Sequence, residues 1–284
     1  MDEAKPSSHG RGGLAQINGI SLRYRIDGVT GPWVAFSNSL LTDLRIWDDV
    51  TTHLSDRYRI LRYDHCGHGG SESRPGTYTF DQLGADLVAL LDHLDIQQTH
   101  IVGISMGGNT GASVAHRHPE RVRSLTMCDC QQTSTLASRE AWLQRRSVAL
   151  ENGMAPIIES AISRWFDIGL QKDHSRAATL RGMMAETTLA GYVGSVELLA
   201  DYNVQDLVES LQLPILLMAG ERDGTAPHNL AALATRLRQA EYFDIPNAGH
   251  ISCVDNPPDF ARRLKTFLDS QDDHSHAITQ KGRQ

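Results

Sequence analysis

The chain has 284 residues, of which 40% are hydrophobic and 21% charged, as in ordinary globular proteins rather than disordered or fibrous ones. The 27 Lys and Arg residues against 34 Asp and Glu residues give a net charge of −7, which argues against binding of nucleic acid or an anionic membrane by bulk charge. We therefore expect a small-molecule substrate as the partner, with no nucleic acid and no membrane. The composition is compatible with either a monomer or a homo-oligomer.

The first 13 residues are polar and resemble neither a secretory signal nor a transit peptide, so we expect a disordered lead-in over residues 1–13. Four cysteines in a chain of this size favour a reducing compartment over a disulfide scaffold. The expected location is cytoplasmic. No apolar run approaches the roughly 20 residues that a membrane helix needs.

The first part of the chain combines short apolar runs with one helical pattern. Residues 22–26, 33–36 and 59–63 have the length and composition of strands. Leucines at helical spacing then predict a core-facing helix over residues 80–94.

A strand, a glycine-rich turn, a helix and a second strand follow. Residues 99–104 predict the first strand, residues 106–118 the helix, which Pro119 ends, and residues 122–128 the second strand. Two strands joined in this way are expected to be parallel neighbours with a right-handed crossover.

The pattern changes after residue 130, because residues 131–204 are polar and helix-rich and contain no convincing strand. The strand pattern returns at residues 214–219, followed by a helix near residues 229–239, a strand at 241–245 and a closing segment at 260–268. This stretch without strands is expected to be a helical insertion.

The order of elements predicts an α/β fold, with a mainly parallel sheet flanked by helices and an inserted helical lid. The expected core comprises residues 14–130 and 205–270, and the lid comprises residues 131–204. The polar residues 271–284 are expected to form a disordered tail.

The turn after residues 99–104 reads Gly103-Ile104-Ser105-Met106-Gly107, which fits the G-x-S-x-G pattern of a nucleophile elbow between strand and helix. Glycines suit this turn because it is too tight for other side chains, and its strain exposes the serine hydroxyl. Ser105 is therefore the candidate nucleophile. The alternative interpretation is an ordinary glycine-serine turn.

A serine nucleophile needs a histidine base and an acid that orients the histidine. Asp223 follows the strand at residues 214–219, and His250 follows the strand at 241–245. Both lie just past the carboxyl ends of predicted strands, where ligands bind in open α/β folds. Glu221 remains a rival for the acid, because either carboxylate could orient the imidazole.

Taken together, these residues resemble the α/β-hydrolases over nearly the whole chain, and within them the 3-oxoadipate enol-lactone hydrolases. The elbow and the triad indicate only the superfamily. The narrower resemblance rests on residues 36–40 (FSNSL), 42–44, Trp47, 61–64 (LRYD), 67–69, Ser71, 103–108, 247–250 (NAGH) and the pair Trp142-x-x-Arg145.

The resemblance implies a serine hydrolase that cleaves a small carboxylate-bearing lactone or ester through an acyl-enzyme. It places the oxyanion hole at the backbone N–H groups of Leu40 and Met106. It also places Trp142, Arg145 and Ser39 against the substrate, with Arg145 holding a carboxylate. The alternative for Trp142 and Arg145 is that they merely stabilise the lid.

Two residues depart from the family pattern: Leu41 stands where a glycine is usual, and Cys66 where an arginine is usual. The pocket on the oxyanion side is therefore expected to differ in shape and charge. The same triad also serves carboxylesterases, secondary-metabolite lactonases and C–C bond hydrolases, and a ligand-binding protein without turnover remains a further alternative.

No metal and no cofactor are expected. The run Asp64-His65-Cys66-Gly67-His68 contains metal-ligand types, but its spacing on a glycine-rich turn makes a poor tetrahedral set. Cys128-x-Cys130 lacks the redox spacing, and no segment has the lysine and spacing of a phosphate loop.

Overall fold

The computed structural model describes residues 11–166 and 168–281, which form an α/β structure around one eight-stranded sheet. The sheet order is β1-β2-β4-β3-β5-β6-β7-β8. The strands are β1 (Arg11–Ile17), β2 (Ile20–Asp27), β3 (Trp33–Ser37), β4 (Arg59–Tyr63), β5 (Thr99–Ile104), β6 (Val122–Cys128), β7 (Ile215–Gly220) and β8 (Ala240–Ile245). β1 and β2 pair antiparallel, β2 pairs antiparallel with β4, and all pairs from β4 to β8 are parallel. This confirms the expected fold class.

Helices flank the sheet and explain its burial pattern. Every residue of β5 and β7 is buried, as expected for central parallel strands that are covered on both faces. α3 packs against β3, β5 and β6, and α12 against β6 and β8. The core elements outside the sheet are η1 (Leu44–Trp47), α1 (Asp48–Thr52), α2 (Phe80–His93), α3 (Met106–Arg117), η2 (Pro119–Arg121), α9 (Gln205–Glu209), α10 (Ala226–Ala234), α11 (Ser252–Asp255) and α12 (Pro257–Lys281).

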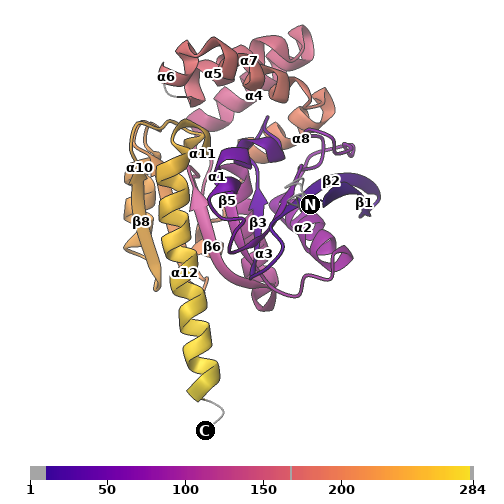
Figure 1. Ribbon diagram of the computed structural model, residues 1–284. Helices are drawn as coiled ribbons and strands as arrows, with labels where there is room; N and C mark the ends of the chain where they lie inside the picture. Colours follow the sequence, from indigo (N-terminus) through magenta and orange to yellow (C-terminus); the bar gives the residue numbers. More distant parts are fainter. Residues whose placement is uncertain (1–10, 167, 282–284) are drawn as a thin grey trace, which may run out of the picture.

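Five helices between β6 and α9 form a layer of their own. Figure 1 shows α4 to α7 above the end of the sheet, away from α12. These helices are α4 (Leu136–Asn152), α5 (Ala155–Trp165), α6 (Ile168–Lys172), α7 (His174–Ala185) and α8 (Leu189–Ala200). α4 packs against α5 and α8, and α7 packs against α5 and α6. We call this layer the lid.

Two expectations about the ends were wrong. Residues 11–13 belong to β1, where Arg11 pairs with Ile26, although residues 1–13 were expected to be disordered; residues 1–10 lie outside the described residues. Residues 271–281 continue α12 instead of forming a tail, and residues 282–284 lie outside the described part. The helix continues because Asp272 is buried and bonded to His100 and Arg123, which ties it to the sheet.

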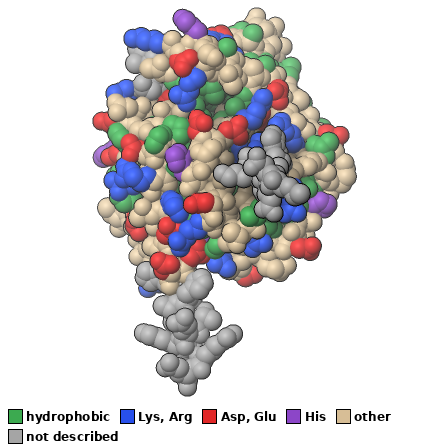
Figure 2. Space-filling view, in the orientation of Figure 1, with side chains coloured by type: hydrophobic (Ala, Val, Ile, Leu, Met, Phe, Trp, Pro, Cys, Tyr) green, Lys and Arg blue, Asp and Glu red, His purple; other side chains and the backbone are tan. Residues whose placement is uncertain are grey.

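The surface of the protein carries side chains of both charges. On the face drawn in Figure 2, acidic and basic side chains are interspersed rather than gathered in one patch of single sign. In the described part of the chain, no helix combines the length and the apolar character needed to cross a bilayer.

Candidate active site

Ser105 occupies a strained turn between β5 and α3. Its φ of 53° and ψ of −117° are unusual for a residue with a side chain. The turn leaves no room at its flanks, since a Cβ on Gly103 would lie 2.2 Å from the Gly107 carbonyl oxygen, and one on Gly107 would lie 2.1 Å from the Ser37 carbonyl oxygen. The two glycines thus allow the backbone to pack closely and hold Ser105 at the start of α3, at the carboxyl end of the sheet.

A chain of two hydrogen bonds links Ser105 to an imidazole and a carboxylate. The Ser105 Oγ lies 3.0 Å from His250 Nε2, and His250 Nδ1 lies 2.9 Å from Asp223 Oδ2. Asp223 follows β7 and His250 follows β8, so three strand ends supply the three groups. The rival acid Glu221 instead accepts a hydrogen bond from the backbone N–H of Asn247, at 3.1 Å.

The surroundings of His250 act on its pKa in opposite directions. Burial disfavours the charged imidazolium, but the charge and hydrogen bond of Asp223 outweigh burial and raise the pKa of His250. The Trp165 ring lies 5.5 Å from the imidazole, centroid to centroid, and covers it from the lid. An imidazole in this setting can accept a proton from Ser105 and hold it as the charged form.

The segment after β3 lies beside the serine. Leu40 is buried and lines the same cavity as Ser105, and Met106 is the first residue of α3, where a backbone N–H has no partner within the helix. Leu41 has a positive φ of 63°. Ser39 is also buried, but it is not among the cavity-lining residues, and its hydroxyl has no hydrogen-bond partner in the described part of the chain.

Above Ser105 lies a cavity of about 360 Å³ between the sheet end and the lid. The lid contributes Trp142 and Arg145 from α4 together with Arg164 and Trp165 from α5. The Arg145 guanidinium lies over the Trp142 ring, 4.6 Å from its centroid. The structure therefore brings both predicted lid residues into the cavity that contains the candidate nucleophile.

Comparison with known proteins identifies the family of the chain. Residues 32–257 match the family model of the alpha/beta hydrolase fold. The chain belongs to the α/β-hydrolase family. It is also similar to 3-oxoadipate enol-lactonase 2 of Acinetobacter baylyi, with 33% identity over 88% of this chain and 93% of the relative, and to 3-oxoadipate enol-lactonase 1 of the same organism, with 29% identity over 90% and 96%.

A solved structure supports the same resemblance. The crystal structure of the enol-lactonase from Burkholderia xenovorans LB400 has a TM-score of 0.86 and 32% identity, covering 90% of this chain and 100% of that one. These comparisons confirm the family resemblance that the sequence motifs indicated.

The α/β-hydrolase fold places one further carboxylate behind the site, which the motifs did not reveal. Asp129 directly follows β6 and accepts hydrogen bonds from the backbone N–H of Gly220, at 2.6 Å, and from the Ser252 hydroxyl. Burial, with the nearby charge of Asp223, raises the pKa of Asp129 well above its usual value. Asp129 therefore connects the ends of β6 and β7 to the segment after His250. Its position at a strand end was the only sequence signal for it.

The histidine-rich turn of this hydrolase is a packed structural element. His65 Nε2 lies 3.0 Å from the Ser37 hydroxyl, and His68 Nδ1 lies 3.0 Å from the Cys66 carbonyl oxygen. Burial lowers the pKa of His65 to about 3 and that of His68 to about 4, so both rings are neutral near pH 7. Within residues 11–166 and 168–281, no three His, Cys, Asp or Glu side chains are placed to hold a metal ion.

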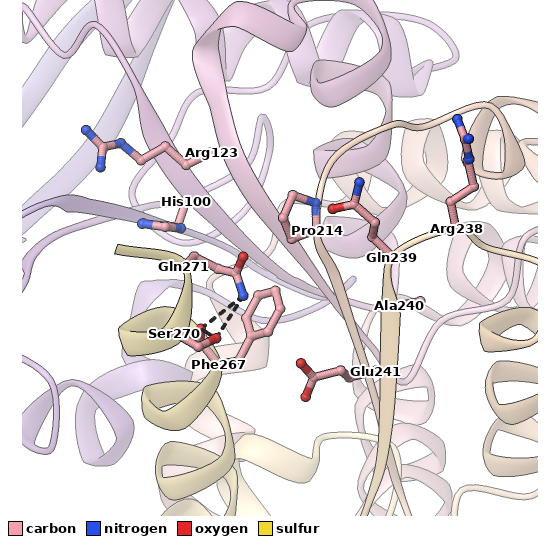
Figure 3. Close-up of a pocket in the computed structure, with 10 residues that line it drawn as sticks. All are labelled: His100, Arg123, Pro214, Arg238, Gln239, Ala240, Glu241, Phe267, Ser270 and Gln271. Carbon is pink, nitrogen blue, oxygen red and sulfur yellow. Dashed lines mark hydrogen bonds between the residues drawn. The ribbon is translucent and has the colours of Figure 1, made fainter. Parts of the chain in front are cut away.

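A second hollow, of about 720 Å³, lies at the opposite end of the sheet, where strands β5 to β8 begin (Figure 3). His100 lines it, but the two ring nitrogens already contact the Ser124 hydroxyl at 2.7 Å and Asp272 at 3.4 Å. Arg123 pairs with Asp272 at 3.2 Å. Ser124 is fully buried and does not line the hollow, so this serine, unlike Ser105, is closed off from the space beside it.

Proposed function

We propose that this α/β-hydrolase cleaves a small carboxylate-bearing lactone or ester, in the manner of a 3-oxoadipate enol-lactonase. The observation that carries the proposal is the hydrogen-bonded chain from Ser105 through His250 to Asp223 at the floor of the lid cavity. The similarity to curated and solved enol-lactonases supports the substrate class.

The proposed reaction uses groups of this chain alone. His250 takes the Ser105 proton as the Oγ attacks the carbonyl carbon, and the Asp223 carboxylate stabilises the resulting imidazolium. The backbone N–H groups of Leu40 and Met106 receive the negative charge that develops on the carbonyl oxygen.

Collapse of the tetrahedral intermediate breaks the ring C–O bond. The leaving oxygen receives the proton from His250, and the released enol tautomerises to a ketone. His250 then removes a proton from water as the water attacks the acyl carbon. The bond between the acyl carbon and the Ser105 Oγ breaks, His250 returns the proton to this Oγ, and the carboxylic acid product leaves.

The lid would select the substrate. We propose that Arg145 binds the free carboxylate, that the Trp142 ring covers the acyl portion, and that Ser39 shapes the oxyanion side. A cavity of about 360 Å³ suits a small lactone, at the lower end of ordinary ligand pockets.

The test is hydrolysis of 3-oxoadipate enol-lactone, followed by ultraviolet absorbance, beside a short-chain p-nitrophenyl ester. We expect the lactone to be preferred and Ser105→Ala to lose at least about 1,000-fold of the activity on both compounds, with an unchanged circular dichroism spectrum. Activity of Ser105→Ala near the wild-type level would refute the role of the serine.

Two further results separate the alternatives. Turnover of the ester alone would favour a carboxylesterase and keep the proposed triad. A fluorophosphonate probe that leaves Ser105 unlabelled, with neither substrate turned over, would favour a ligand-binding protein without turnover.

A further inference from the structure

Two guanidinium groups face the catalytic cavity without a carboxylate partner among the described residues. Arg145 lies 4.6 Å from the Trp142 ring centroid, Arg164 lies 5.8 Å from that of Trp165, and Arg164 Nε donates to Ser160 oxygens. Of the other lid arginines, Arg139, Arg146 and Arg181 form ion pairs with Asp201, Glu197 and Glu159, and Arg176 donates to the Val254 carbonyl oxygen. Arg145 and Arg164 differ from these four in lining the catalytic cavity, where a ligand can reach them.

The two charges also oppose each other. Burial lowers the pKa of both guanidinium groups, and the positive charge of Arg145 lowers that of Arg164 further. Arg145 is half-buried, whereas Arg164 is exposed at the edge of the cavity. An anion bound between the two guanidinium groups would offset their mutual repulsion.

We propose that Arg164 completes a carboxylate-binding corner with Arg145, so that the two guanidinium groups hold a single substrate carboxylate. The carboxylate has two oxygens with about four acceptor positions, which two guanidinium groups can share. A single carboxylate fits better than two, because the cavity of about 360 Å³ must also hold the acyl group with its carbonyl carbon at Ser105. This inference rests on the proposed function, and it defines the substrate as an ester or lactone with one carboxylate on its acyl or alcohol arm.

The experiment compares two esters with acyl chains of equal length, mono-p-nitrophenyl adipate and p-nitrophenyl hexanoate. The variants are Arg145→Gln, Arg164→Gln and the double arginine variant. The control is Arg181→Gln, which removes a lid arginine that is ion-paired outside the cavity.

We expect Arg164→Gln to lower kcat/KM for the adipate ester by about 10- to 100-fold, mainly through KM, and for the hexanoate ester by a much smaller factor. The double arginine variant should lose less than the product of the two single losses, because both act on one carboxylate. Arg181→Gln should keep the wild-type preference for the adipate ester.

Calorimetric titration with adipate tests binding without turnover. We expect adipate to bind the wild-type protein and Arg181→Gln, and to bind Arg164→Gln at least about 10-fold more weakly. If Arg164→Gln lowers kcat/KM equally for both esters, or leaves adipate binding unchanged, the inference is wrong. Turnover that depends on Ser105 would in that case still support the proposed function. Adipate binding that depends on Arg164 in a protein without ester or lactone turnover would overturn only the proposed function.

Discussion

Gly107→Ala tests whether the elbow and the segment after β3 act as one rigid unit. A Cβ at this position would lie 2.1 Å from the Ser37 carbonyl oxygen, 2.5 Å from its carbonyl carbon and 2.6 Å from the Asn38 carbonyl oxygen. All three atoms are backbone, so no side-chain rotation can relieve the overlap. The added methyl group must push the segment that carries Leu40 away from Ser105.

The size of the effect follows from the displacement. An ordinary contact for a Cβ needs more than about 3 Å, so the shortest distance must grow by about 1 Å. A shift of about 1 Å in a catalytic group costs about 100-fold in rate. We therefore expect kcat to fall by about 100-fold on the lactone and on a neutral ester alike, because the oxyanion hole serves both.

Steady-state kinetics and thermal unfolding together check this expectation. Overpacking of this kind should lower the free energy of unfolding by about 1–3 kcal/mol, which leaves the variant folded at 25 °C. The control is Gly182→Ala in α7, where a Cβ would meet nothing within 4 Å. It should keep full activity and gain up to about 1 kcal/mol of stability. A folded Gly107→Ala variant with wild-type kcat would refute the geometry assigned to the oxyanion hole.

Three other expectations concern single groups. His250 must be neutral to act as a base, and its pKa is raised above the usual value of 6.5. We therefore expect kcat/KM to fall as the pH drops, with a midpoint above pH 6.5. A midpoint below pH 6.5 would contradict the role of Asp223. Asp129→Ala should lower the free energy of unfolding by about 2–4 kcal/mol in urea titrations, because the Gly220 N–H and the Ser252 hydroxyl lose their buried acceptor; a loss within about 0.5 kcal/mol would contradict this. The four buried cysteines should react with a thiol reagent many times more slowly in the native protein than in denaturant, and equal rates would show that they are accessible.

The parts of the site that sequence could predict are those fixed by local backbone chemistry. Gly103 and Gly107 are required by contacts within a few residues or across one strand, so the elbow pattern alone identifies Ser105. Asp223 and His250 followed from their positions at strand ends, because parallel strands bring their carboxyl ends to one edge. The choice between Asp223 and Glu221 needed the structure, since both carboxylates follow β7 within three residues.

The parts that sequence could not predict depend on long-range contacts. The sequence did not predict β1, because Gly12 and Gly13 interrupt the alternation of apolar and polar residues that marks a strand. This segment forms a strand through its pairing with β2. Residues 271–281 look like a polar tail until the contacts of Asp272 with His100 and Arg123 are known. The sequence could not identify Arg164 either, because a lid arginine that faces a cavity has the same sequence pattern as one that faces solvent.

The groups proposed for the reaction and those proposed for substrate choice lie on two different kinds of structural element. Ser105, Asp223 and His250 sit on turns at the ends of buried strands, whereas Arg145 and Arg164 extend from helices of the lid. The lid meets the core closely where a Cβ on Gly191 would lie 2.4 Å from the Gly67 carbonyl oxygen, and where Ser134 and Tyr202 exchange hydrogen bonds at its base. Because these attachments fix the lid without using the elbow, substitutions in α4 and α5 can change the preferred substrate while the hydrogen-bonded chain at Ser105 stays intact.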